Sequence, residues 1–221
     1  MKRIMIYGDS NTYGHLPGSA HPVTGAALRY GENERWPGVV QNILGTDEYK
    51  ILEEGFCGRT TVFDDPMQHG RNGLEYIDVA FATCAPVDMV VVMLGTNDTK
   101  DMFSPSALNI YYGMNKLIVT IKNLIAQSNC PEAKILLINP PHLIPTADGT
   151  YIWDFSERST EIGKQLGTYY ARLAKEQGLE FLDADALEGC VPSDIDGTHL
   201  TKEAHAVLGK AVAKKIREIL E

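Results

Sequence analysis

Short apolar runs alternate along this chain with longer segments in which apolar residues recur every three or four positions. The runs at 3–7, 89–94 and 134–138 are almost continuously apolar, as is typical of parallel strands that are buried on both faces. The pattern predicts five strands, at Lys2–Tyr7, Tyr49–Glu53, Val87–Leu94, Lys134–Asn139 and Leu179–Asp183.

The longer segments predict helices that cover the two faces of a sheet. Pro37 suits a first helical turn, Gly178 suits a helix end and Thr201 suits an N-cap. The helices are predicted at Trp36–Leu44, Leu74–Cys84, Pro105–Gln127, Ser156–Gln177 and Thr201–Leu220. The alternation of strand and helix predicts an α/β fold, a three-layer α/β/α sandwich with a five-stranded parallel sheet, and a single domain over residues 1–221.

Polar and glycine-rich segments follow the predicted strands. In such a sheet the carboxyl ends of the strands meet at one edge, where ligands bind. The segments are Ser10, Cys57-Gly58, Gly95–Asp98, Pro140–His142 and Asp183–Asp196. Two long loops, Thr12–Glu34 and Thr60–Gly73, leave from the same edge, so we expect them to flank the mouth of a site.

Composition narrows the classes of protein. The 221 residues carry a net charge of −9, which argues against nucleic acid as a partner. No apolar run reaches the roughly 18 residues that would span a membrane, and the first ten residues lack the core of a signal peptide. We therefore expect a cytoplasmic protein with no membrane partner, whose four scattered cysteines are reduced.

Ser10 is the first candidate for chemistry. It stands in Gly8-Asp9-Ser10-Asn11, a sequence that taken alone is ordinary for a turn. Near the other end of the chain, Asp196 precedes His199 by three residues in a glycine-containing turn. This spacing lets the carboxylate reach Nδ1–H of the imidazole while Nε2 faces a hydroxyl group. We therefore predict Ser10 as nucleophile, His199 as base and Asp196 as the carboxylate that orients the base.

Two further positions are predicted to stabilise an oxyanion. Asn97 stands in Gly95-Thr96-Asn97-Asp98, where its side-chain N–H could point at the developing charge, although asparagine also forms turns. Gly58 could add a backbone N–H where the chain must approach the substrate closely.

Other chemistries have weaker support. Cys57 is a rival nucleophile near the site, but no His or Asp neighbours it in sequence, so we interpret it as a lining residue. Asp64-Asp65 and Asp183/Asp185 show no recognisable metal-ligand spacing, and no phosphate-binding glycine motif is present. We therefore expect no metal and no cofactor.

The remaining histidines and aromatic residues give a less specific prediction. His15, His21 and His69 lie in the long loops and His205 on the last helix, so none of these is predicted to be the base. The residues expected to line the substrate site are Asn11, Cys57, His142, Trp153, Phe155 and Thr198.

The motifs taken together resemble the SGNH (GDSL) hydrolase family. They are Gly8-Asp9-Ser10, Gly58, Gly95-x-Asn97-Asp98 and Asp196-x-x-His199, in the family's order and over most of the chain. The resemblance implies a flavodoxin-like fold, Ser10, Asp196 and His199 as catalytic triad, and an oxyanion hole formed by the amides of Ser10 and Gly58 and the side chain of Asn97.

A narrower resemblance is to the bacterial arylesterase/acyltransferase branch of the family. It rests on Arg35–Val39, Glu53–Gly55, Arg59–Thr61, Asp64–Pro66 and Leu94–Lys100. The resemblance implies short acyl esters as substrates and a homo-oligomer, with an octamer as one candidate size. Asn11 departs from the apolar residue common after Gly-Asp-Ser, which leaves the catalytic roles intact but bears on substrate preference.

The function predicted is therefore a serine carboxylester hydrolase for short-chain acyl esters, which could also transfer acyl groups to alcohols. A carbohydrate O-acetylesterase would use the same residues, but it predicts an open polar cleft instead of a narrow apolar one. A non-catalytic flavodoxin-like binding module is the third alternative, and it requires the Ser10, Asn97 and His199 pattern to be a coincidence.

Overall fold

The computed structural model describes residues 1–20 and 27–221, so residues 21–26 of the loop Thr12–Glu34 lie outside the described part. Its sheet contains five parallel strands in the order β2-β1-β3-β4-β5. The strands are β1 (Lys2–Gly8), β2 (Tyr49–Gly55), β3 (Met89–Met93), β4 (Lys134–Asn139) and β5 (Glu180–Asp183). This is the flavodoxin-like order, and it confirms the predicted parallel sheet.

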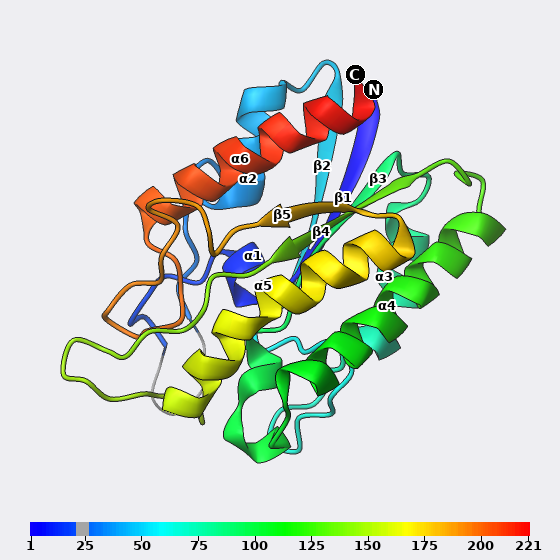
Figure 1. Ribbon diagram of the computed structural model, residues 1–221. Coiled ribbons are helices and arrows are strands. Elements are labelled where there is room, and N and C mark those ends of the chain that lie inside the picture. Colours follow the sequence, from blue (N-terminus) through cyan, green and yellow to red (C-terminus); the bar gives the residue numbers. More distant parts are fainter. Residues whose placement is uncertain (21–26) are drawn as a thin grey trace.

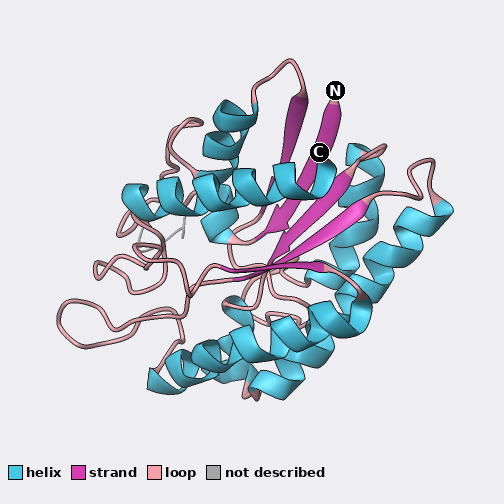
Figure 2. Ribbon diagram, turned by 45° about the horizontal axis from the view of Figure 1, so that its top comes forward, coloured by secondary structure: helices cyan, strands magenta, loops and turns pink. Residues whose placement is uncertain are grey.

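Helices cover both faces of the sheet (Figures 1 and 2). One face packs against α2 (Trp36–Leu44) and α6 (Lys202–Leu220). The other packs against α3 (Gly73–Cys84), α4 (Ala107–Gln127) and α5 (Glu157–Gln177). The three-layer sandwich is therefore confirmed. Among the residues that the structure describes, no helix has both the length and the apolar character needed to cross a membrane.

The continuous apolar runs follow from this double burial. Successive side chains of a strand point to opposite faces of the sheet. Ile4 and Ile6 of β1 pack in the cluster under α2 and α6, whereas Met5 and Tyr7 pack in the cluster under α3, α4 and α5. All four side chains are fully buried, so no position along this part of β1 tolerates a polar residue at low cost.

The main differences from the predicted elements lie at their ends. Helices α4, α5 and α6 begin one or two residues later than predicted, because Ser106, Ser156 and Thr201 precede the first helical residue as N-caps. Strand β3 is shorter than the predicted Val87–Leu94. One short helix, α1 (Ser10–Tyr13), was not predicted; it starts where the Asp9 carboxylate accepts a hydrogen bond from the Asn11 amide.

The topology brings the predicted motifs to the carboxyl edge of the sheet. Helix α1 follows β1, the Cys57-Gly58 segment follows β2, and the 3-10 helix η1 (Asn97–Thr99) follows β3. A second 3-10 helix, η2 (Asp101–Phe103), continues the same connection. Because β1 lies between β2 and β3, these three segments are neighbours along the edge.

Candidate active site

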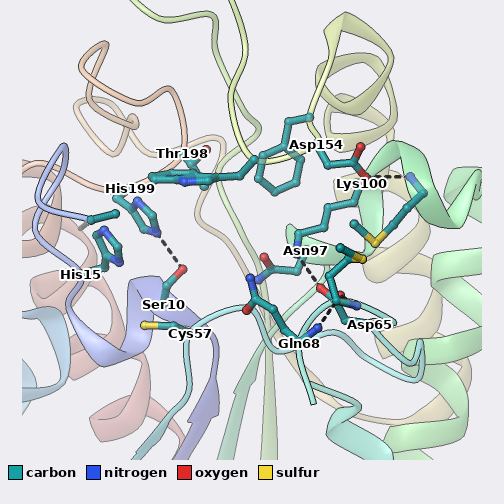
Figure 3. Close-up of a pocket in the computed structure, with 16 residues that line it drawn as sticks. Ser10, His15, Cys57, Asp65, Gln68, Asn97, Lys100, Asp154, Thr198 and His199 are labelled. Atoms are coloured by element: carbon teal, nitrogen blue, oxygen red, sulfur yellow. Dashed lines mark hydrogen bonds and ion pairs between the residues drawn. The ribbon is translucent and has the colours of Figure 1, made fainter. Parts of the chain in front are cut away.

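Ser10, His199 and Asp196 form one hydrogen-bonded chain (Figure 3 shows Ser10 and His199). Nε2 of His199 lies 2.9 Å from Oγ of Ser10, and Nδ1 lies 3.0 Å from Oδ2 of Asp196. All three residues are buried. If Nδ1–H donates to Asp196, Nε2 is left to accept a proton from the serine hydroxyl, which is the arrangement that activates a serine nucleophile.

The turn before α6 holds Asp196 in its ionised form. Oδ1 accepts hydrogen bonds from the amides of Thr198 and His199, and Oδ2 accepts one from the amide of Gly18. Burial alone would raise the pKa of Asp196, but the hydrogen bond from the His199 ring, the charge of that ring and the amides of His199 and Thr198 outweigh it and lower the pKa. The turn requires Gly197: its φ is 69°, and a Cβ there would lie 2.1 Å from the Ile144 carbonyl oxygen.

Asn11 supports this turn and does not line the cavity, which corrects the prediction for it. Its Nδ2 donates to the Thr198 carbonyl oxygen at 3.2 Å, and its Oδ1 accepts from the Leu200 amide at 2.9 Å. The side chain therefore bonds to the backbone on both sides of His199. Asn11 is itself buried, and its amide satisfies two backbone groups of this turn.

The predicted oxyanion donors belong to segments that hold each other in place. Nδ2 of Asn97 donates to the Arg59 carbonyl oxygen at 3.2 Å, and the Asp98 carboxylate accepts from both the amide and the hydroxyl of Thr61. The connection after β3 thereby fixes the loop after β2. Gly58 in that loop has a φ of 78°, a conformation that strains other residues. Gly58 and Asn97 both line the same cavity as Ser10.

The cavity has a volume of about 490 Å³, which lies within the usual range for small-molecule sites. The predicted lining residues that do border it are Cys57, Trp153, Phe155 and Thr198. Both long loops contribute to its wall, through His15 and Ala20 of one and Asp65, Met67 and Gln68 of the other.

One part of the wall is polar, which the sequence did not reveal. The ammonium group of Lys100 lies 2.9 Å from the Asp65 carboxylate, and the two side chains are only 7% and 1% exposed. Oδ1 of Asp65 also accepts hydrogen bonds from the amides of Met67 and Gln68. Figure 3 shows this pair across the pocket from His15. The cavity thus combines an aromatic wall at Trp153 and Phe155 with a buried ion pair.

His142 does not border this cavity, so the prediction that it lines the substrate site is wrong for the cavity described here. Its Nδ1 lies 2.6 Å from Oδ1 of Asp185, and its amide donates to the same oxygen at 2.8 Å. The sequence showed no acid near His142 because its partner is 43 residues away and follows the neighbouring strand β5.

His15 is a further residue at the site that the sequence did not indicate. Its ring stacks face to face on that of His199, with centroids 3.8 Å apart and an angle of 3° between the planes. Trp153 packs edge-on against both imidazoles. Its nearness to Ser10 in the sequence was the only available signal, because His199 lies 184 residues further on.

The geometry of the site disfavours two rival chemistries. Burial raises the pKa of the Cys57 thiol to about 11, so the thiol stays protonated and is a poor nucleophile. His15, Asp196 and His199 offer atoms within the reach of one metal ion. Both ring nitrogens of His199, however, already take part in hydrogen bonds that a serine mechanism requires.

Comparison with known proteins agrees with this geometry. Residues 6–207 match the GDSL-like lipase/acylhydrolase family. The structure of the native aryl esterase of M. smegmatis superimposes with a TM-score of 0.88, 34% identity and full coverage of both chains. Est24, a carbohydrate acetylesterase from Sinorhizobium meliloti, gives the same values. The structure of a carbohydrate acetylesterase family member from S. meliloti superimposes with a TM-score of 0.82 and 31% identity, and the match covers 100% of this chain and 99% of its own. No match was found among curated protein sequences.

The family match extends over most of the chain, and the fold agrees throughout. The chain therefore belongs to the GDSL-like lipase/acylhydrolase family and is a carboxylic ester hydrolase.

Proposed function

We propose that the protein hydrolyses short-chain acyl esters with Ser10 as nucleophile, His199 as general base and Asp196 as its orienting carboxylate. The observation that carries the proposal is the position of the His199 ring. Its two nitrogens lie 2.9 Å from the Ser10 hydroxyl and 3.0 Å from the Asp196 carboxylate. A buried imidazole held at both ends in this way can accept the serine proton and remain stabilised as imidazolium.

The reaction proceeds in two steps. Ser10 Oγ attacks the ester carbonyl carbon while its proton moves to His199 Nε2, and the carbonyl oxygen becomes an oxyanion that the amides of Ser10 and Gly58 and the Asn97 side chain stabilise. The alcohol leaves with the proton from His199, and Ser10 is acylated. Water, or a second alcohol in the case of acyl transfer, then attacks the acyl-enzyme with His199 again as base.

The test combines Ser10→Ala with an activated-serine probe. We expect the folded variant to retain less than about a thousandth of the wild-type kcat on 4-nitrophenyl acetate, and a fluorophosphonate to label only the wild type. Activity should survive EDTA, because no step uses a metal. Substantial activity in a correctly folded Ser10→Ala protein would refute the proposal, and loss of activity in EDTA would support the metal alternative.

A carbohydrate O-acetylesterase is the second candidate function. The buried Lys100–Asp65 pair in the cavity wall favours it, because a hydroxylated alcohol can hydrogen-bond to an ammonium group that an aryl group cannot use. Two of the similar structures are those of a carbohydrate acetylesterase and of a carbohydrate acetylesterase family member. Comparing kcat/KM for acetylated monosaccharides with that for phenyl acetate separates the two functions.

We also propose a homo-oligomer whose subunits cover part of the cavity mouth. Met67 supports this, because it borders the cavity and yet leaves 80% of its surface exposed. Leu28 and Ile195, in the two other loops at this edge, are 65% and 63% exposed. Light scattering tests the assembly: a particle of 24.4 kDa would contradict it. A narrowed mouth further predicts a preference for C2–C4 acyl groups over C12.

A further inference from the structure

His15 lies at the site but has no role in the mechanism proposed above. Its ring is buried and lies parallel to the base at 3.8 Å. The backbone holds it there: the His15 amide donates to the Ser10 carbonyl oxygen at 3.0 Å, and the Gly18 amide donates to Asp196 at 3.1 Å. The segment from His15 to Gly18 therefore contacts the backbone of Ser10, the ring of His199 and the carboxylate of Asp196.

The effect of His15 on the stacked ring of His199 depends on whether His15 is charged. Among the described residues its Nε2 has no hydrogen-bond partner, and nothing offers it the acceptor that an imidazolium would need. Burial and, to a smaller extent, the charge of His199 lower the pKa of His15 to about 4, although the charge of Asp196 opposes them. The ring is therefore neutral near pH 7 and presents the face of an uncharged aromatic ring to the base.

The other titratable groups near His199 leave the His15 ring as the main contact on one face of the His199 ring. Asp196 bonds to the edge of the His199 ring. His205 on α6 is buried and neutral, its pKa lowered to about 3 by burial, and Arg35 lies before α2. Cys57 and Asp154 lie elsewhere on the cavity wall. None of these is stacked on the His199 ring; of the described aromatic residues, Trp153 meets it only edge-on.

We propose that His15 is a positioning residue that stabilises the imidazolium form of His199 in the transition state. During attack His199 gains a proton, and a cation over the face of a neutral aromatic ring within about 6 Å is attracted to it. The same stack fixes the plane of the ring, so that Nε2 stays directed at Ser10. The effect falls on the transition state and should appear in kcat more than in KM.

The test compares His15→Phe with His15→Leu. Both replacements are apolar and fill the site, but only phenylalanine keeps an aromatic face. We expect kcat on 4-nitrophenyl acetate to fall about 10-fold in His15→Leu, with KM little changed. In His15→Phe, kcat should stay close to the wild-type value. The rate of Ser10 labelling by a fluorophosphonate should follow the same order, because it reports activation of the serine without any ester. His15→Met serves if the leucine variant does not fold.

The matched control is the same pair of replacements at His142, which lies at the same sheet edge but does not border the cavity. Equal kcat values for the folded Phe and Leu variants of His15, or a loss confined to KM, would overturn the inference. The inference rests on the proposed ester hydrolysis, and the two fail separately. An inactive wild type or an active Ser10→Ala refutes the proposed function, whereas an active wild type with equivalent Phe and Leu variants refutes only the role of His15.

Discussion

Two histidine–aspartate pairs lie at the carboxyl edge of this sheet, and only one of them has the surroundings of a catalytic pair. His199 and Asp196 are 5% and 1% exposed, and a serine hydroxyl lies at the free nitrogen of the imidazole. His142 and Asp185 are 30% and 21% exposed, and within the described part of the chain no hydroxyl bonds to that imidazole. The distance within the second pair, 2.6 Å, is in fact the shorter one.

The difference shows that a short His–Asp distance does not identify a base. In both pairs hydrogen bonds from the histidine offset the effect of burial and lower the pKa of the aspartate. What distinguishes His199 is the groups around it: the Ser10 hydroxyl at Nε2, the stacked ring of His15, and the proposed oxyanion donors in the wall of the same cavity. His142 instead ties the end of β4 to the segment after β5, which is a structural role.

The most severe test of this comparison is the same substitution in both pairs. Asp196→Asn should lower kcat by about 10⁴-fold, because an amide in place of the carboxylate favours the wrong tautomer of His199 and no longer stabilises its charge. Asp185→Asn removes a charge from an equivalent pair outside the cavity and should change kcat by less than about threefold. Steady-state kinetics on 4-nitrophenyl acetate measures both. A similar loss in the two variants would mean that the distinction between the pairs is wrong.

Next in size is the loss of a proposed oxyanion donor, Asn97, which lines the same cavity as His199, whereas His142 does not border that cavity. Asn97→Ala should lower kcat by about 10²–10³-fold with KM nearly unchanged, because the amide contacts the oxygen more strongly once it carries charge. The variant also removes the hydrogen bond to the Arg59 carbonyl oxygen, so thermal unfolding should be recorded alongside. A higher KM at constant kcat would make Asn97 a substrate-binding residue instead.

A smaller effect is expected at Asn11, which braces the backbone on both sides of His199. Asn11→Leu should lower kcat by about 10-fold and destabilise the protein by about 1–3 kcal/mol, since the Thr198 carbonyl and the Leu200 amide lose their buried partners. Kinetics and urea unfolding of the same sample measure the two effects. An unchanged kcat in this variant would show that the turn before α6 holds His199 without the two hydrogen bonds from Asn11.

The sequence was sufficient for the architecture, and it named the three residues that the structure places in one hydrogen-bonded chain and that we propose as the triad. Doubly buried strands such as β1 leave an unbroken apolar run, and the residues of each motif lie close together along the chain. The short helix α1 was missed because four residues rich in Ser, Asn and Thr carry little helical pattern; the Asp9 cap was its one local signal.

The roles of Asn11, His15 and His142 depend on pairings that no local pattern encodes. Asn11 meets its partners across 187 and 189 residues, and His142 meets Asp185 across 43. The buried Lys100–Asp65 pair joins two loops 35 residues apart. In each case the contact follows from which strands are neighbours, so it becomes visible only when the sheet order is known.

The smallest predicted effect is on the stability of the folded protein at low pH, and it arises from the buried ring of His15. Burial lowers the pKa of His15 from 6.5 to about 4, so the unfolded chain binds a proton below about pH 6.5 that the native protein refuses until about pH 4. The stability associated with the neutral ring is therefore fully present above pH 6.5 and is lost as the pH falls. His15→Phe cannot titrate. The difference in unfolding free energy, wild type minus variant, should thus fall by about 1–2 kcal/mol between pH 7.5 and pH 5.

Urea unfolding at the two pH values measures this change, and taking the difference between proteins removes other titrating groups. His205, whose pKa burial lowers to about 3, acts in the same direction in both proteins. Asp9 and Asp98 act in the opposite direction, because burial raises their pKa values to about 7 and about 6 and the native state then favours their protonated forms as the pH falls. A difference that stays constant with pH would mean that His15 accepts a proton in the folded protein. The ring would then be charged below about pH 6.5, where it could not stabilise the imidazolium of His199, so the proposed role of His15 would be confined to higher pH.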